Sequence, residues 1–325
     1  MEPIKPSDLK TILHSKRSNI YYLQYCRVLV NGGRVEYVTD EGKRSLYWNI
    51  PIANTTVIML GTGTSVTQAA MREFARAGVL VGFCGGNGTP LYAANEVEVS
   101  VSWLTSQSEY RPNEYLQNWM SFWFDDEKRV EAAIAFQRVR IAQIKKHWLN
   151  ERRNKQEKFI IEQPVLQSLL ERYENSLITC TSVQYLLAQE AVLTKALYKL
   201  AAETTKYGEF TRAKRGGGAD IANRYLDHGN YLAYGLAATA CWVTGLPHGV
   251  AVLHGKTRRG GLVFDVADII KDALILPQAF ISAMAGEDEQ EFRQRCITGL
   301  QKAEALDLMI ETLQSTAEYF GRTDK

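Results

Sequence analysis

The stretch from His254 to Asp272, HGKTRRGGLVFDVADIIKD, brings together a histidine, a basic loop and three regularly spaced aspartates. At about 100° per residue, Asp265, Asp268 and Asp272 fall along one edge of a helix, beside an apolar face. Clustered carboxylates suit hard divalent cations such as Mg²⁺ or Mn²⁺, and the basic loop suits a phosphate substrate. A solvated acidic face after a basic turn would give the same pattern. Taken alone, the stretch leaves both a metal site and a solvated helix face open.

Glu190 is a second residue that could do chemistry, because it places a carboxylate on an apolar helix stripe. A helix is expected from about Ser182 to Lys206, and Glu190 lies on the line of its leucines, between Leu187 and Leu193. Burying an unpaired carboxylate costs several kcal/mol, so this side chain needs a cation, a hydrogen-bonding partner or the wall of a cleft. A buried salt bridge meets the same need, and the sequence leaves both possibilities open.

His254 differs from the other four histidines, which have no recognisable partner pattern. It precedes the basic turn, so a helix after the loop brings the aspartates back toward it. One neutral imidazole with two or three carboxylates favours Mn²⁺ or Mg²⁺ over structural zinc, which would require more Cys or His ligands.

The composition is that of an ordinary globular protein. The chain has 325 residues, 46% of them hydrophobic and 23% charged, and a net charge of +2, which does not mark the whole molecule as a nucleic-acid-binding protein. Its five cysteines are scattered without a C-x-x-C pair, and the N-terminus has no apolar signal-peptide core. We therefore expect a cytoplasmic protein in which the cysteines act as small buried hydrophobes.

One apolar segment, residues 229–253, contains no Lys, Arg, Asp or Glu and has the length of a membrane span. Four glycines and Pro247 interrupt it. It therefore favours a buried core helix ending near Gly245, and no membrane association is expected.

Strand-like patterns dominate the first third of the chain. Alternating or β-rich segments are 20–30, 34–40, 45–52 and 96–104. The Asn-Gly-Gly turn at 31–33 predicts a hairpin between the first two. Helical periodicity follows, with one long helix from Pro112 to Lys155 and a last one from Glu287 to about Tyr319. The expected fold class is α+β, with a β-rich domain containing one helix at 1–105 and an all-helical domain at 106–325.

The segment 55–85 reads strand, glycine turn, helix and strand, as a dinucleotide-binding unit does. Val66 occupies the third glycine position, and the second strand ends in Gly-Gly-Asn without an acidic residue for a ribose. Nucleotide binding is therefore not expected. Ser65 and Gln68 predict a capping box at the start of the helix.

Local positive charge marks a candidate DNA surface. From Lys206 to Arg259 there are eight Lys and Arg residues against three acidic ones. Arg212, Lys214 and Arg215 precede a run of three glycines, which permits close approach to phosphates or simply forms a loop.

Taken together, Glu190 in a helix, then NYLAYG, then LHGKTRRGGLVFDVADIIKDALILPQAF resemble the CRISPR-associated integrase family, number one among the Cas proteins. The closest likeness is to its subtype I-F, and it runs along nearly the whole chain. The resemblance implies an N-terminal β domain used for dimerisation and a C-terminal all-helical catalytic domain.

By position, the resemblance implies that Glu190, His254 and Asp268 are catalytic metal ligands and that Asp265 is a further acidic ligand at the same centre. It places Lys271, Tyr234 and Lys256 near the DNA, and the basic extension adds Arg258 and Arg259 to the candidate DNA contacts. Asp272 receives no role and is expected to be exposed.

The activity implied is Mg²⁺- or Mn²⁺-dependent joining of a spacer 3′-hydroxyl to the CRISPR repeat, or hydrolysis when water replaces the hydroxyl. The partners implied are double-stranded DNA (spacer precursor and CRISPR repeat), a second copy of the chain, and a second adaptation protein fused to a helicase-nuclease. Three alternatives stay open. They are a stand-alone structure-specific nuclease, a non-catalytic nucleic-acid adaptor, and a magnesium-dependent pyrophosphate enzyme, which would need a second carboxylate cluster on a facing helix.

Overall fold

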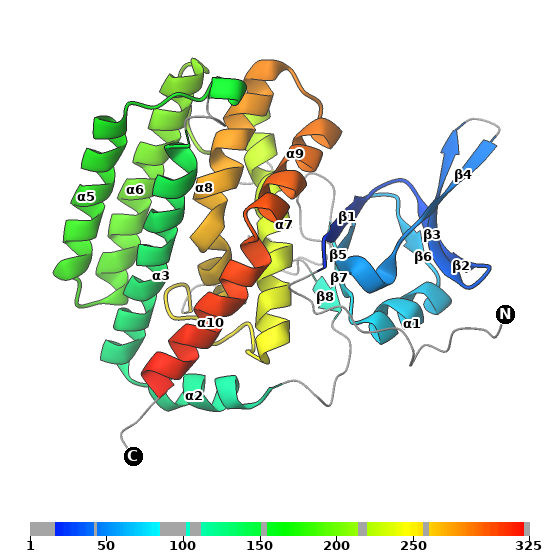
Figure 1. Ribbon diagram of the computed structural model, residues 1–325, viewed down its shortest axis with the longest axis horizontal. Coiled ribbons are helices and arrows are strands. Elements are labelled where there is room, and N and C mark those ends of the chain that lie inside the picture. The colour runs from blue at the N-terminus through cyan, green and yellow to red at the C-terminus, as the bar shows by residue number, and fades with distance from the viewer. Residues whose placement is uncertain are drawn as a thin grey trace. The chain divides into compact units, whose positions relative to one another are not determined.

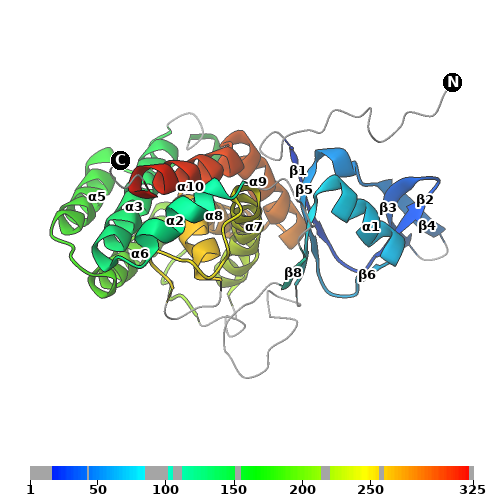
Figure 2. The ribbon, with the colours of Figure 1, turned by 90° about the horizontal axis from the view of Figure 1, so that it is seen from below.

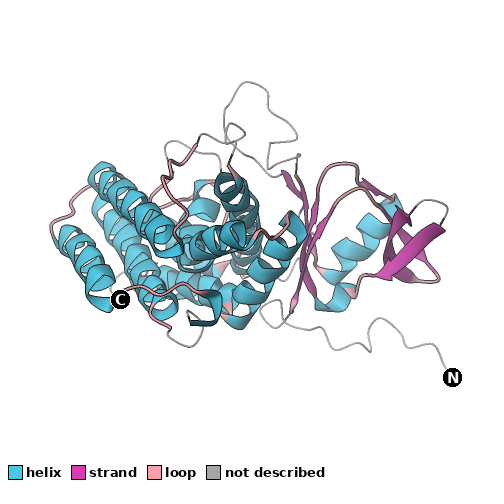
Figure 3. Cartoon of the chain, turned by 90° about the horizontal axis from the view of Figure 1, so that it is seen from above, coloured by secondary structure: helices cyan, strands magenta, loops and turns pink. Residues whose placement is uncertain are grey.

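The computed structural model describes residues 17–41, 44–84, 102–104, 112–150, 155–213, 220–255 and 260–321. Their contacts form two compact units. One holds the described residues up to Cys84 together with Ser102–Leu104, and the other holds those from Pro112 onward. Figure 3 shows that the described strands belong to the first unit and that the second is built from helices and loops.

The first unit contains two four-stranded sheets. Its strands are β1 (Asn19–Leu23), β2 (Arg27–Asn31), β3 (Arg34–Glu41), β4 (Arg44–Asn49), β5 (Thr55–Leu60), β6 (Ser65–Val66), β7 (Leu80–Phe83) and β8 (Ser102–Leu104). One sheet has the order β1-β5-β7-β8, in which only β8 is antiparallel to its neighbour. The other has the order β4-β3-β2-β6, antiparallel except for β6 beside β2.

The single α-helix of the described part of this unit, α1 (Gln68–Ala77), lies between the two sheets (Figure 2). Its Phe74 is fully buried and shares one core with Val28 of β2 and Ile58 of β5. Both sheets thus bury apolar side chains against the same helix, and the expected β-rich region with one helix is confirmed.

Two local expectations for this unit were wrong. The run 20–30 is two strands in different sheets, because the backbone turns at Tyr25, which has a φ of 48°. The start of α1 is capped by Thr67, whose side chain accepts the N–H of Ala70 at 3.3 Å, whereas Ser65 pairs in β6. The predicted hairpin at 31–33 is present, with Asn31 opposite Arg34.

The second unit is helical. Its helices are α2 (Glu114–Trp123), α3 (Asp126–Trp148), α5 (Gln163–Ile178), α6 (Val183–Thr205), α7 (Ile221–Thr244), α8 (Gly261–Ala285), α9 (Glu289–Lys302) and α10 (Ala305–Gly321). The almost wholly buried α7 and α8 lie side by side at the centre, and α3, α6, α9 and α10 cover them (Figure 1). Their close approach requires Gly229, where a side chain would collide with Ile275.

Helix ends at the core follow the expected signals. Ser182 caps the start of α6 by accepting the N–H of Tyr185, and Gly245 ends α7 in the left-handed conformation, with a φ of 74°. All five cysteines are free and buried, as expected. None of the helices in the described ranges combines the length and the apolar character that a membrane span requires.

Two long helices were predicted where the structure has pairs. The helical pattern from Pro112 breaks between α2 and α3, where Asp125 caps α3 by accepting the N–H groups of Glu127 and Lys128. The last helix breaks between α9 and α10 at Glu304, which has a φ of 51°. Apolar periodicity continues across both breaks because each member of a pair buries one face in the same unit.

Candidate metal centre

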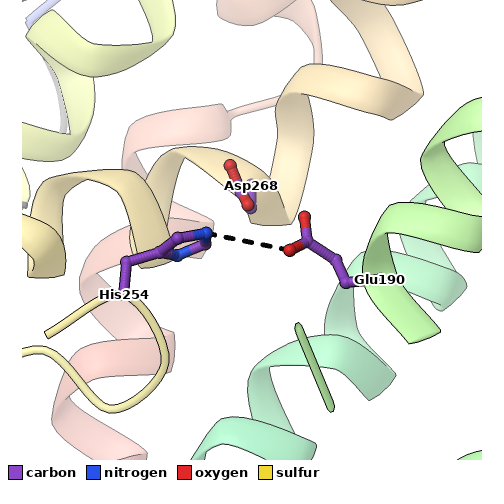
Figure 4. A group of neighbouring side chains, drawn as sticks. All are labelled: Glu190, His254 and Asp268. Atoms are coloured by element: carbon purple, nitrogen blue, oxygen red, sulfur yellow. Dashed lines mark ion pairs between the residues drawn. The ribbon is translucent and has the colours of Figure 1, made fainter. Parts of the chain in front are cut away.

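Three segments of the helical unit bring Glu190, His254 and Asp268 together. Glu190 lies on α6, Asp268 on α8, and His254 in the loop that precedes α8. One ligand atom from each lies within 4.8 Å of the others, and no other such group of three His, Cys, Asp or Glu occurs within the described residues. The three side chains point toward a common centre (Figure 4), with His254 Nε2 3.7 Å from Glu190 Oε2.

Asp265 holds the histidine and its loop from behind. Its Oδ2 accepts the backbone N–H groups of Val252 at 2.8 Å and Leu253 at 3.0 Å. Its Oδ1 accepts the backbone N–H of His254 at 3.0 Å and lies 2.8 Å from Nδ1 of the same residue. Because a carboxylate oxygen accepts, Nδ1 carries a proton and donates to Asp265, and Nε2 is the ring nitrogen that faces Glu190. Burial would lower the pKa of His254, but the bond to Asp265 and the nearby carboxylates raise it.

The paired glycines at the start of α8 allow this loop to fold back onto the helix. Gly260 has a φ of 78°, which favours glycine. At Gly261 a Cβ atom would lie 2.8 Å from the Ala251 Cβ and 2.9 Å from the carbonyl oxygen of His254. A larger residue there would push the loop off the helix, and His254 would move away from Asp265.

Glu190 uses its two oxygens differently. Oε1 accepts a hydrogen bond from Arg140 Nη1 at 3.0 Å, and Oε2 faces His254. The side chains of Glu190 and Arg140 are 12% and 1% exposed. Of the possibilities that the sequence left open, the buried salt bridge is therefore present on one oxygen, while the other remains available at the centre.

Asp268 is 2% exposed and has less support than its neighbours. Lys271, one turn along α8, forms an ion pair with its Oδ1. Its Oδ2 is buried and accepts no hydrogen bond from any residue in the described ranges. A buried carboxylate oxygen without a donor is costly, and ligation of a cation would remove that cost. The residues present therefore fit a divalent metal ion.

The electrostatics of the two carboxylates point the same way. Burial raises the pKa of Glu190 and outweighs the attraction of Arg140, and the charge on Asp268 raises it further. For Asp268, burial would raise the pKa, but Lys271 and His254 in particular hold it at about 2. The two acids thus repel each other across the centre, and a cation between them would relieve this repulsion.

A cleft of about 400 Å³ lies beside the histidine loop. It is lined by the first turns of α3 and α6, by residues 251–253 and by Gly255. A ligand in this cleft would lie next to the elements that carry His254 and Glu190.

Two of the aspartates lie elsewhere than the sequence indicated. Asp265 was expected beside the metal, but it lies behind His254 with both oxygens engaged by the loop. Asp272 was expected to be exposed, but it is 2% exposed and forms a buried ion pair with Arg140. Helical spacing gave a common edge for the three aspartates but could not tell which neighbours cover it.

The candidate DNA contacts fall into three groups. Lys271 lies at the centre, on Asp268, and Tyr234 is 6% exposed on α7 against Phe264, with ring centroids 4.9 Å apart. Arg212, a candidate from the basic segment, pairs with Asp227 and donates to Asn223 Oδ1 at 2.7 Å. Five candidates lie outside the described residues, and they are Lys214, Arg215, Lys256, Arg258 and Arg259.

Arg140 is the charged residue of this site that sequence reasoning missed. It follows Phe136 and precedes Ile144 at helical spacing, and both of these are buried on α3. A charge on an apolar stripe was the signal that identified Glu190, and the same signal is present here. Arg140 and Glu190, the two charged residues on apolar stripes, form an ion pair with each other.

Comparison with known proteins places this site in context. A sequence model described as "CRISPR associated protein Cas1" matches residues 21–291. The "CRISPR-associated endonuclease Cas1" of Pectobacterium atrosepticum is 73% identical over 312 residues, covering 96% of each chain. The protein of the same name from Pseudomonas aeruginosa is 67% identical over 318 residues, covering 98% of each chain.

Solved structures share the fold at low sequence identity. A TtCas1–DNA complex matches with a TM-score of 0.64 and 19% identity, over 94% of this chain and 93% of that one. A casposase bound to integration product matches with a TM-score of 0.69 and 13% identity, over 94% and 92%. A Cas6-RT-Cas1–Cas2 complex matches with a TM-score of 0.63 and 14% identity, over 94% of this chain and 35% of that one.

Proposed function

Because the chain belongs to the Cas1 family of CRISPR-associated proteins, we propose that it is a divalent-metal-dependent DNA endonuclease and integrase. In this proposal the 3′-hydroxyl of a spacer attacks a phosphodiester of the CRISPR repeat, and water in place of the hydroxyl gives hydrolysis. The observation that carries the proposal is the convergence of Glu190, His254 and Asp268 within 4.8 Å.

The ligands proposed for Mg²⁺ or Mn²⁺ are Glu190 Oε2, His254 Nε2 and the Asp268 carboxylate. Two carboxylates and one imidazole match these cations better than structural zinc. When bound, such an ion would activate the attacking hydroxyl and stabilise the charge that develops on the leaving oxygen.

The other side chains of the site keep the ligands in position. Asp265 fixes the tautomer and the ring direction of His254, as a carboxylate behind a metal-binding histidine commonly does. Lys271 offsets the charge of Asp268 and, as a buried cation at the centre, would also attract a DNA phosphate. Tyr234 is proposed to contact the end of the substrate strand from α7.

Double-stranded DNA, as spacer precursor and as repeat, is the proposed substrate. The likeness to a Cas1–DNA complex and to a casposase bound to integration product supports it. Basic residues of the two segments on either side of α7 in the sequence are the proposed phosphate contacts, and they are Lys214, Arg215, Lys256, Arg258 and Arg259.

We assign separate roles to the two parts of the chain. The β-rich part, residues 1–105, would form a homodimer, and the helical part, residues 106–325, would carry the metal-dependent chemistry. A second adaptation protein, fused to a helicase-nuclease as in subtype I-F, would join the dimer. The likeness to a Cas6-RT-Cas1–Cas2 complex supports a second adaptation protein as a partner, without bearing on the fusion.

The proposal is tested by strand transfer in vitro, with a labelled spacer, repeat DNA and the partner protein, in Mg²⁺ or Mn²⁺. Glu190→Ala, His254→Ala and Asp268→Ala should each lower the rate by about two to three orders of magnitude, because each removes a ligand of an ion that contributes several kcal/mol to the transition state. Circular dichroism checks that the variants are folded.

Glu203→Ala is the matched control, because Glu203 is on the same helix as Glu190 and its side chain is 61% exposed. It should transfer strands like the parent protein. Full activity in all three ligand variants would rule out the proposed centre. Hydrolysis without strand transfer in the parent protein would favour a stand-alone nuclease, and DNA binding without either reaction would favour an adaptor.

A further inference from the structure

Arg140 is fully committed inside the helical unit. It is 1% exposed, and all five of its N–H groups have acceptors. Nε donates to Asp272 Oδ2 at 2.9 Å, and Nη1 donates to Gln137 Oε1 at 3.1 Å and to Glu190 Oε1 at 3.0 Å. Nη2 donates to Thr194 Oγ1 at 2.8 Å and to Asp272 Oδ2. These five hydrogen bonds therefore prevent the guanidinium from rotating or shifting.

The acceptors that hold Arg140 are themselves held. Gln137 Oε1 also accepts the hydroxyl of Tyr173 at 2.9 Å, which ties α5 to the network. The backbone carbonyl of Asp272 accepts Trp148 Nε1 at 2.9 Å, which ties the end of α3 to α8. The position of the guanidinium thus does not depend on Glu190, although the position of Glu190 depends on the guanidinium.

This asymmetry has a consequence for the carboxylate of Glu190. With Oε1 bound to a fixed donor, the carboxylate cannot turn both oxygens toward the centre, and Oε2 is left facing His254 at 3.7 Å. We propose that Arg140 is a positioning residue that presents one oxygen of Glu190 to the cation, and that Asp272 cancels the charge of Arg140 beside it. The inference rests on the metal centre proposed above.

Asp272 is needed because Arg140 is a cation next to a cation site. A guanidinium that contacts a metal ligand without a balancing anion would repel Mg²⁺ or Mn²⁺, because screening is weak in a buried environment. Asp272 takes two of its donors and balances that charge. If Arg140 acted only through its charge, removing it would tighten metal binding. If it positions Glu190, removing it weakens metal binding, so the two roles predict changes of opposite sign.

The test is a titration of the full chain with Mn²⁺ in the absence of DNA. Binding is measured as the loss of the electron paramagnetic resonance signal of the free ion. Arg140→Lys keeps the charge but cannot hold Glu190 and Asp272 together, because an ammonium lacks the planar fork of a guanidinium. Arg140→Met with Asp272→Leu removes a cation and an anion together, so it leaves the local charge balance unchanged. Both should weaken Mn²⁺ binding by about 10- to 100-fold, the usual effect of losing a group that supports a metal ligand.

Arg138→Lys is the control, because Arg138 is exposed on the same helix, two residues away. It should bind Mn²⁺ like the parent protein. Thermal unfolding without metal identifies any variant that fails to fold, and Arg140→Lys decides the matter if the double variant does not fold. Binding by the Arg140 variants that equals or exceeds that of the parent protein overturns the positioning role.

The same Mn²⁺ titrations separate the role of Arg140 from the metal centre itself. If the parent protein binds no Mn²⁺, or if Asp268→Ala leaves its Mn²⁺ site intact, both the metal centre and the role of Arg140 are overturned. A parent protein with such a site, together with unchanged binding in both Arg140 variants, would overturn the positioning role alone.

Discussion

Asp265 shows what one carboxylate contributes when it supports a ligand without being one. It accepts three backbone N–H groups and the Nδ1–H of His254. In Asp265→Asn one acceptor oxygen becomes an NH₂ donor that faces N–H groups. We expect Mn²⁺ affinity to fall by about 10- to 100-fold and the free energy of unfolding by about 1–3 kcal/mol.

Metal titration and urea unfolding of the same variant check this expectation. A loss of stability with unchanged Mn²⁺ affinity would limit Asp265 to folding the loop. If the Mn²⁺ affinity and the free energy of unfolding are both unchanged, the four hydrogen bonds of Asp265 contribute little to either.

Single residues were predictable where a charge contradicted its surroundings. Glu190 was identified because it lies on an apolar stripe. The helix edge offered Asp265, Asp268 and Asp272 alike, and only the resemblance to a known family selected Asp268. Their partners were harder to find. Arg140 is fifty residues from Glu190 along the chain, and no local spacing links them. Asp272 was wrongly expected to be exposed, because its cover comes from α3, a helix predicted independently of α8.

At the scale of elements, the segment that carries Arg212 is anchored to the start of α7. Asn223 Oδ1 accepts Arg212 Nη1 at 2.7 Å and the N–H of Ala213 at 3.0 Å. Asp220 caps α7 by accepting the N–H of Asn223 at 3.0 Å, and its Oδ1 also accepts the hydroxyl of Tyr207 at 2.9 Å. One helix end thus organises the chain on both sides of residues 214–219.

The cap should make stability depend on pH. Partial burial would raise the pKa of Asp220, but its hydrogen bonds with Asn223 and Tyr207 lower it below the usual value. A carboxyl with a lowered folded-state pKa stabilises the protein above its unfolded pKa, about 4, and loses this effect as pH falls through the folded pKa. Asp220→Ala should therefore cost about 1 kcal/mol at neutral pH and progressively less below pH ~4.

Urea unfolding of the parent protein and of Asp220→Ala between pH 7 and pH 3 measures this difference. A gap between the two proteins that stays constant over this range would contradict the assignment, since an uncharged cap does not titrate.

Element types were predictable, but breaks within them were not. The stripe of α6 gave both ends of that helix, and the glycine after α7 gave its C-terminal end, because caps and periodicity are local. The breaks at Asp125 and Glu304 left the apolar periodicity intact and were missed. In the first unit, alternation within 20–30 identified extended chain, but the assignment of its halves to two sheets depends on β5 and β3, which come later in the sequence.

At the scale of the whole molecule, the α+β class followed from the change of period after the first third of the chain. The order of strands in the two sheets did not, since parallel pairs such as β1 with β5 join segments far apart in sequence. The metal centre has the same character. Its three ligands come from two helices and a loop, so only the resemblance to a known family joined them before the structure did.

A test of DNA binding should change basic residues that have no known structural role inside the protein. Arg212 pairs with Asp227, so Arg212→Ala would remove an ion pair of a buried carboxylate, and a loss of stability could then be mistaken for a loss of DNA contacts. Lys214→Ala with Arg215→Ala avoids this problem. If both contact phosphates, affinity for spacer DNA should fall, and the slope of log affinity against log salt should become shallower by about 2, about one for each contact.

Lys199→Ala, whose parent side chain is 78% exposed on α6, serves as the control. An unchanged slope in the double variant, measured by fluorescence anisotropy, would remove this segment from the DNA surface and leave Lys256, Arg258 and Arg259 as the remaining basic candidates.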